Sequence, residues 1–505
     1  MTHRDAPDLH IGHRGRIGTL PLTSFLISAS APMTVLAGGV VATLAVTGVI
    51  GTPLSFPLIT GVLALFTVGY AAMSRHILNA GAFYSYLAQG LGRIWGVSGA
   101  GVALLAYNTI QIGLYGLFGV AAAAFADLQW GLAWSWWVWA LLSMAVVGIC
   151  GVARVDLSAV VLTVLLVAEV VAVVVFDVGA FVNPAEGRIS VEGLLPSELF
   201  QPGIGGVFAL GIAAFIGFES GAAYTRDVKD PRRTVARATF LTLGIIGVLY
   251  TLSAWALILA YGPNQVVDAT RDPAAGVPFS FMATQFGETV ATIANVLLIT
   301  SVFAAMLSFH NTTARYTFAL GREGVLPGFL GRTGKRSGAP VAGSVAQTLV
   351  ALAAVAVFAA LGRDPMTELF AWGSYIAAVG LLAIMIGTSI GVIRYFRGRD
   401  LPETTWQRTI APVLAVIGLM FIEVVMVINS DSVLGTEKGS ALTFILPGLV
   451  LLAAVLFGLW ALILRSNRPE VYQRIGHGES TAVPVPVSPQ RSAAEPAQVG
   501  SGPLF

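Results

Sequence analysis

Long apolar segments alternate with short polar ones along almost the whole chain. Each apolar segment is about 20 residues or longer, which is the length an α-helix needs to cross the hydrocarbon core of a bilayer. Gly and Pro recur inside these segments, as they do in membrane helices. The pattern predicts twelve spanning helices, over residues 24–47, 55–74, 96–125, 131–150, 157–181, 204–223, 239–261, 288–312, 341–361, 367–393, 409–430 and 441–464.

The two ends of the chain lack this pattern. Residues 1–23 are polar, and residues 465–505 are rich in Pro, Ser and Ala, which predicts a disordered tail. Residues 28–31 are similar to a signal-peptidase site. The apolar run before them is too short, however, and hydrophobicity continues beyond them, so we expect an uncleaved first helix.

The composition also indicates a polytopic membrane protein. Hydrophobic residues make up 56% of the 505 residues and charged residues only 11%, whereas soluble domains carry about 25% charged residues. The single cysteine, Cys150, excludes a disulfide framework and a cysteine-based metal site. Four of the six histidines lie in the polar ends, so no metal cluster is expected.

Lys and Arg are concentrated in alternate connecting segments. If the N-terminus is cytoplasmic, 24 of the 28 basic residues fall on the cytoplasmic side, and the remaining four are Arg188, Arg271, Arg363 and Lys438. Lys and Arg favour cytoplasmic loops. We therefore expect a multi-pass protein of a prokaryotic plasma membrane with both termini in the cytoplasm.

Two of the apolar segments are interrupted. The first contains Pro32 and Gly38-Gly39, and the sixth contains FIGFESG, residues 215–221. Pro removes a backbone donor and Gly weakens a helix. Interruptions at corresponding positions of two five-helix halves indicate an inverted-repeat transporter with its binding site at the breaks. The alternative is that both helices are simply kinked.

Glu219 lies within the interrupted sixth segment. An ionisable residue inside a membrane segment is costly, which makes it a functional candidate. The alternative is that Glu219 lies near the membrane face and pairs with Arg226 in the basic segment that follows.

Three motifs resemble those of the amino acid–polyamine–organocation permeases. They are GYAAMSRHILNAGAFYSYLAQGLG (69–92), FIGFES followed by DVKDPRRTVARA (227–238), and NTTARYTFALGREGVLPGFL (311–330). The resemblance covers about residues 24–465. It implies an all-α, LeuT-type fold with two inverted repeats, residues 24–181 and 204–393, followed by two further helices in residues 409–464.

The resemblance also implies where the substrate binds. It would lie between the unwound centres of the first and sixth helices, beside four residues, Phe215, Ile216, Gly217 and Phe218. Glu219 matches a carboxylate that relatives associate with proton coupling. Ala213 stands where some relatives have a gating Trp.

Two departures from the family pattern bear on the substrate. Many relatives have a Gly-Ser-Gly break in the first helix, whose free amides hold the substrate carboxylate. This chain has Ser30 and then Pro32-Met33-Thr34, which resembles bacterial putrescine importers. In the fifth helix, Glu169 stands where some proton-coupled members have Lys. It could carry a proton or balance a cationic substrate; the alternative is a protonated Glu169 in a buried hydrogen bond.

Other polar residues in the apolar segments have good structural explanations. Tyr107 matches an aromatic residue of the putrescine-importer pattern, but Tyr107, Asn108 and Gln111 could equally form interhelical hydrogen bonds. A packing or structural role is the favoured interpretation for Ser308, His310, Asn311 and Glu423. The Trp residues at 134, 136, 137 and 139 fit an interfacial belt.

These features predict a proton-driven permease for amino acids or related amines. A dedicated polyamine importer or exchanger is the second interpretation, and a non-transporting nutrient sensor is the third. No His-Glu-x-x-His pair or nucleophile–base pair indicates an enzyme. The expected partners are the substrate, protons and the lipid bilayer, with a homodimer as one option. We expect no cofactor, metal or nucleic acid.

Overall fold

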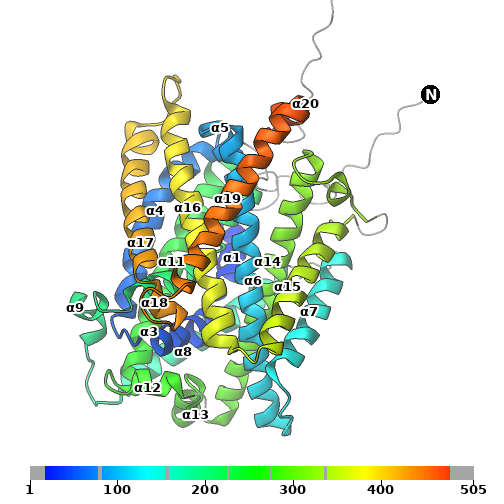
Figure 1. Ribbon diagram of the computed structural model, residues 1–505. Coiled ribbons are helices and arrows are strands. Elements are labelled where there is room, and N and C mark those ends of the chain that lie inside the picture. The colour runs from blue at the N-terminus through cyan, green and yellow to red at the C-terminus, as the bar shows by residue number, and fades with distance from the viewer. Residues whose placement is uncertain are drawn as a thin grey trace, which may run out of the picture.

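The computed structural model describes residues 18–77, 82–153, 159–224, 228, 230–272, 275–334 and 338–477. The regular elements in these ranges are helices, and the long ones run between the two ends of one bundle (Figure 1). Twelve segments are long and apolar enough to cross a membrane. This confirms the predicted all-α, twelve-helix membrane fold.

The first span is Thr19–Thr47, built from α1 (Thr19–Ser30), α2 (Pro32–Thr34), η1 (Val35–Val40) and α3 (Val41–Thr47). The next spans are α4 (Thr52–Ser74), α6 (Arg93–Trp130), α7 (Trp136–Ala153), α8 (Ala159–Val182), α10 (Ile204–Phe215) with η3 (Phe218–Tyr224), and α11 (Pro231–Tyr261). The remaining spans are α14 (Glu288–Arg322), α15 (Val341–Ala360), η6 (Pro365–Phe370) with α16 (Ala371–Phe396), η7 (Trp406–Ile410) with α17 (Ala411–Ile428), and α19 (Leu442–Asn467).

Short helices cover the two ends of the bundle. At one end lie α5 (Ala82–Gly90) and α20 (Pro469–Arg474); towards the other lie α9 (Pro196–Leu199), α12 (Val266–Arg271), α13 (Phe279–Phe286) and α18 (Ser430–Leu434) (Figure 1). The connecting segments also contain η2 (Glu192–Leu194) and η5 (Gly328–Gly331). These short elements were not predicted, because hydropathy detects only segments that cross the bilayer.

Several helices extend beyond their predicted apolar windows. The helix α14 continues to Arg322, ten residues past the predicted end at 312, and α11 begins at Pro231 rather than at 239. A hydropathy window ends where apolar residues end, whereas the backbone ladder continues into the polar boundary. Pro is also well placed in the first turn of a helix, where its missing N–H is not needed.

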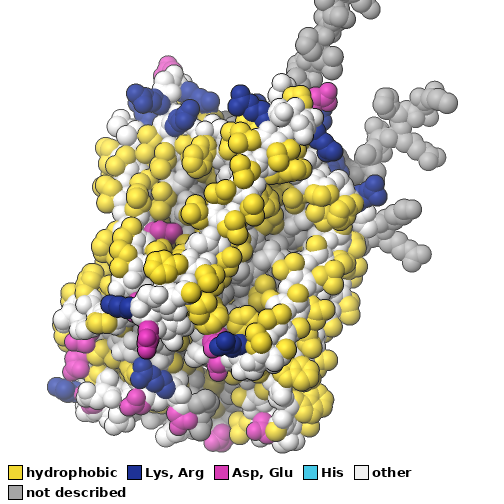
Figure 2. All heavy atoms as spheres, in the orientation of Figure 1, with side chains coloured by type: hydrophobic (Ala, Val, Ile, Leu, Met, Phe, Trp, Pro, Cys, Tyr) yellow, Lys and Arg dark blue, Asp and Glu magenta, His cyan; other side chains and the backbone are white. Residues whose placement is uncertain are grey.

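Side-chain types separate along the bundle. Figure 2 shows apolar side chains around the middle, Lys and Arg at the end that carries α5 and α20, and most Asp and Glu at the opposite end. Leu451 and Leu456 of the peripheral helix α19 are among many exposed apolar residues. An apolar belt between two polar ends is the surface that a bilayer requires.

Glycine lets the central helices approach closely. A methyl group at Gly373 of α16 would lie 2.5 Å from the backbone oxygen of Thr109 in α6. One at Gly113 of α6 would lie 3.2 Å from Cα of Phe370. Small residues at such crossings allow backbone-to-backbone contact in membrane proteins.

The Gly373→Ala substitution should therefore destabilise the protein. The added methyl group would meet backbone atoms that cannot move independently, and overpacking of this kind costs about 1–3 kcal/mol. Thermal unfolding of the purified protein in detergent should show a lower Tm. The matched control is Gly244→Ala in α11, where a methyl group would meet nothing within 4 Å; an equal loss of Tm in both variants would contradict the packing argument.

Candidate functional site

The first span is interrupted at Ala31. This residue has φ 45° and ψ 77°, and among the described residues it is the one non-glycine residue with positive φ. The left-handed conformation is costly for an L-residue, and the next residue, Pro32, has no N–H with which to continue the ladder. The helix is thus broken rather than kinked, and the π-helical segment η1 adds a second irregularity at Gly38-Gly39.

The sixth span is interrupted directly beside the first. The helix α10 ends at Phe215, Ile216 is extended, and Gly217 has φ 114° before the 3₁₀-helix η3 begins. A methyl group at Gly217 would lie 3.0 Å from Cβ of Ala29, in α1. Both its φ and this close contact require glycine, so the two breaks share one place in the bundle.

Glu219 is buried at this place, with only 1% of its surface exposed. The hydroxyl of Tyr107 donates to Oε1 over 2.9 Å, and the backbone N–H of Gly217 donates to Oε2 over 2.8 Å. Tyr70 donates to the backbone oxygen of Glu219 over 2.9 Å. These contacts hold Glu219 inside the bundle; Arg226, its partner in the alternative interpretation, lies outside the described residues.

Glu169 is a second buried carboxylate, 5% exposed, on α8. Ser301 of α14 donates to its Oε2 over 2.8 Å, and Thr34 donates to Oγ of Ser301 over 3.0 Å. The backbone N–H of Met33, in the first turn after the break, also faces Glu169. The carboxylate of Glu169 thus lies beside the backbone donor that the break makes available.

A small cavity of about 40 Å³ lies between the two breaks. Its lining includes Ser30, Ala31, Thr34, Leu210, Ala213, Ala214, Ile216, Ile110, Leu114, Ala305, Phe309, Phe370 and Ser374. A water molecule takes up about 30 Å³ in the liquid. The cavity is therefore small, and a substrate larger than a few waters would require the breaks to move apart.

Three of the residues predicted to bind substrate line this cavity, namely Ser30, Thr34 and Ile216. The others are buried but do not line it: Pro32, Met33, Tyr107, Phe215, Gly217 and Phe218. Phe215 packs on the ring of Tyr250, with centroids 5.7 Å apart, and the hydroxyl of Tyr250 donates to the backbone oxygen of Ser30 over 2.9 Å.

The sequence did not single out Tyr70, Tyr250 or Ser301. Their partners Glu219, Ser30 and Glu169 are 149, 220 and 132 residues away along the chain. A hydroxyl within an apolar segment is common, so only the three-dimensional structure distinguishes these three.

A separate polar network joins α6, α14 and α15. Nε2 of His310 lies 2.6 Å from Oγ of Ser344, and its Nδ1 lies 3.4 Å from Nε2 of Gln111. The side chain of Gln347 donates to that of Gln111. Asn108 donates to Leu104 of its own helix. The contacts of Gln111, His310 and Gln347 favour a role in interhelical hydrogen bonding. Within the described ranges, no group of three or more His, Cys, Asp or Glu could hold a metal ion.

Two of the three motifs meet at the end of the bundle that carries α5 and α20. The hydroxyl of Tyr84 donates to Glu323 over 2.5 Å, and the backbone N–H of Gly476 contacts both side chains at 3.3 Å. Burial, and then the charge of Glu323, raise the pKa of Tyr84 well above its usual value, so Tyr84 remains a donor. The motifs thus tie α5, α14 and the end of α20 together.

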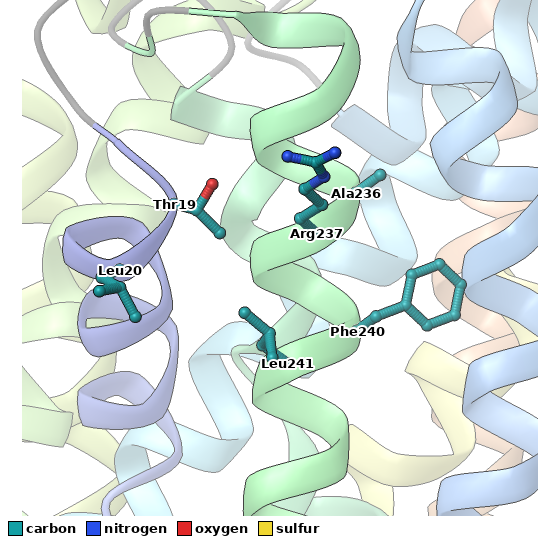
Figure 3. A pocket seen from close by; sticks show the side chains of 6 residues that line it. All are labelled: Thr19, Leu20, Ala236, Arg237, Phe240 and Leu241. Carbon is teal, nitrogen blue, oxygen red and sulfur yellow. The ribbon is translucent and has the colours of Figure 1, made fainter.

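A larger, open groove lies elsewhere. It has a volume of about 630 Å³ and lies between the first turn of α1 and α11, where Thr19, Leu20, Ala236, Arg237, Phe240 and Leu241 form its walls (Figure 3). Thr19 precedes the break by twelve residues, about 18 Å of helix. We do not assign the substrate to this open surface groove.

Two interrupted helices that meet at a small cavity, each with a buried carboxylate beside its break, define a membrane transporter of the broken-helix type. A family model described as "Amino acid permease" matches residues 17–474. The chain belongs to this family, within the amino acid–polyamine–organocation superfamily, and is an amino acid permease. The permeases of this family are transporters rather than enzymes.

Several curated proteins are similar to the chain. The branched-chain amino acid permease of Lactococcus lactis is 26% identical over 76% of this chain and 83% of its own length. An uncharacterised transporter of Mycobacterium tuberculosis is 31% identical over 38% of this chain and 42% of its own length. A low-affinity putrescine importer of Escherichia coli is 30% identical over 23% of this chain and 24% of its own length.

Proposed function

We propose that this permease imports amino acids or related amines together with protons. The observation that supports the proposal is the pairing of each break with a buried carboxylate. Glu219 accepts from the backbone N–H of Gly217 in the sixth span, and Glu169 faces that of Met33 in the first. Within the described residues no Lys or Arg side chain is buried to compensate these carboxylates.

Protonation would act directly on the backbone at both breaks. A hydrogen bond from an N–H to a charged carboxylate is roughly twice as strong as one between neutral groups. Taking up a proton at Glu219 or Glu169 therefore weakens the contact that holds its break in the closed form. Binding of a proton and opening of the cavity are coupled by the same hydrogen bonds.

Purified protein in liposomes provides the test. Labelled leucine, arginine and putrescine are supplied separately, with an acidic outside medium and sodium absent. We expect accumulation of at least one of them that disappears when a protonophore collapses the gradient. Accumulation that needs a sodium gradient and ignores the proton gradient would contradict proton coupling.

We also propose that both termini are cytoplasmic. The basic end of the bundle in Figure 2 carries α5 and α20, and Arg93 and Arg468 are among the arginines there. Basic residues mark the cytoplasmic side. A phosphatase reporter fused after Phe505 should be inactive, and a fluorescent protein fused there should fluoresce; the reverse pattern would contradict this topology.

A further inference from the structure

A third buried carboxylate, Asp177, lies on the helix that carries Glu169. Asp177 follows Glu169 by eight residues, so it lies about 12 Å farther along α8 and on the same broad face. It is 7% exposed. Its neighbour Phe176 packs against Phe281 of α13, with ring centroids 5.6 Å apart. Asp177 therefore lies towards the end of the bundle that the proposed topology places outside.

The carboxylate of Asp177 is only half satisfied. Oγ of Ser253, on α11, donates to Oδ2 over 2.9 Å, whereas the buried Oδ1 has no hydrogen-bond partner among the described residues. An isolated buried charge with a free oxygen is strongly unfavourable unless a proton or another cation neutralises it. The free oxygen is therefore where such a cation would bind.

The helices packed against α8 supply no competing charge; in the loop after α8, the exposed Glu186 and Arg188 pair with each other over 3.3 Å, and Glu192 is half-buried. Neither α1, α2 nor α13 carries a titratable side chain, and α11 brings only Tyr250 and Tyr261 to this half of the bundle. The helix α14 begins with the exposed Glu288, and its next titratable residue is His310, which is bonded within the network described above. The arginines of α11 lie at its other end.

We propose that Asp177 is an outer proton-binding site that supplies Glu169 during transport. This inference rests on the proposed proton coupling and extends it to a residue outside the breaks. A direct transfer over about 12 Å is excluded, because a proton donor and acceptor must approach within about 3 Å. The hydroxyls of Ser253 and Tyr250 lie one turn apart on α11. They provide polar positions between the two carboxylates, with water completing the path.

Aromatic contacts near Asp177 are consistent with a gate at the outer end of the bundle. The ring of Trp255 packs edge-on against Phe181, with centroids 4.9 Å apart, and its Nε1 donates to the backbone oxygen of Ser190. These aromatic contacts join the outer ends of α8 and α11 to the loop that follows α8. Phe181 lies one turn beyond Asp177 on α8, so these contacts lie between Asp177 and the outer end of the bundle and would separate when that end opens.

The first experiment measures protonation without transport. Purified wild type, Asp177→Asn and Glu423→Gln are titrated while the carbonyl stretch of protonated carboxylic acids is followed by infrared difference spectroscopy. Glu423, on α17, is the matched control, because its Oε2 is also buried without a partner but lies outside the breaks. We expect Asp177→Asn to remove a titrating band that Glu423→Gln retains; no missing band would overturn the proposal.

The second experiment measures whether the acid stimulation of transport depends on Asp177. Uptake into liposomes is followed at varied external pH with the internal pH fixed. Asp177→Asn should lose most of the acid stimulation, whereas Glu423→Gln should keep it. If the wild type is stimulated and Asp177→Asn is equally stimulated, only this inference fails. If the wild type shows no stimulation, the proposed coupling itself fails, and the outer site with it.

A more conservative variant tests the proposal even if Asp177→Asn does not fold. Ser253→Ala keeps the Asp177 carboxylate and removes its hydrogen-bond donor. We expect this variant to shift the external pH of half-maximal uptake and to leave the rate at saturating acidity within about a factor of three. A profile that coincides with the wild type would overturn a role for this pair, whatever the stability of Asp177→Asn.

Discussion

Replacing Glu219 by Gln should leave a folded protein whose uptake is slow and almost independent of external pH. The amide is nearly the same size, and its oxygen can still accept from the N–H of Gly217, which now donates to Oε2 over 2.8 Å. The amide cannot take up or release a proton. Hydrogen bonds to charged groups contribute about 1.5–3 kcal/mol, so we expect a fall in rate of roughly 10- to 100-fold.

The control for this prediction is Tyr107→Phe. It removes the hydroxyl that donates to Oε1 of Glu219 over 2.9 Å but keeps the carboxylate. Uptake should be altered in rate, and its acid stimulation should persist. Both variants are measured in liposomes beside a thermal unfolding curve, which reports folding separately. If Glu219→Gln kept the full acid stimulation of the wild type, Glu219 would not be the coupling residue.

The sequence was sufficient for the spans and the breaks because both depend on local chemistry. About twenty apolar residues define a membrane helix whatever surrounds it. Pro32 and Gly217 disturb a helix by their own backbone properties. The structure refines the first break by one residue, since Ala31 takes the left-handed conformation and Pro32 opens the next helical turn.

The partners of the two carboxylates depend on distant parts of the chain. The contact between Ser301 and Glu169 joins residues 132 positions apart, and Tyr107 and Glu219 are 112 apart. No local pattern specifies which hydroxyl of one helix meets which carboxylate of another. Packing of the whole bundle decides it.

Unlike the partners of the two carboxylates, Asp177 is a functional candidate on the sequence alone. It is an ionisable residue inside the predicted segment 157–181, and the cost of such a residue singles it out as firmly as Glu169. Asp177 lies in none of the family motifs, so the motifs do not indicate it. Its burial and its free Oδ1 became visible only with the fold.

Cationic amines should compete for the site better than zwitterions of equal size. A zwitterion must place its carboxylate against backbone donors, and the donor nearest the first break, the N–H of Met33, already faces Glu169. Pro32 offers no donor. Each hydrogen bond that a buried carboxylate lacks costs roughly 1–3 kcal/mol, which corresponds to about 10- to 100-fold in affinity.

A cationic amine needs no donor for a carboxylate, and it is attracted by the negative charges at the breaks. Glu169 and Glu219 lie at the two breaks, and no Lys or Arg is buried among the described residues. Opposite charges attract strongly where water is excluded.

Competition against the best labelled substrate measures this preference. Putrescine and other amines should inhibit uptake at lower concentrations than alanine. The Glu169→Gln variant should narrow the difference, because it removes one attracting charge and weakens the hold on the N–H of Met33. Strong competition by alanine with none by putrescine would contradict the prediction. The N–H of Met33 would then have to leave Glu169 and bind the substrate carboxylate when the cavity opens.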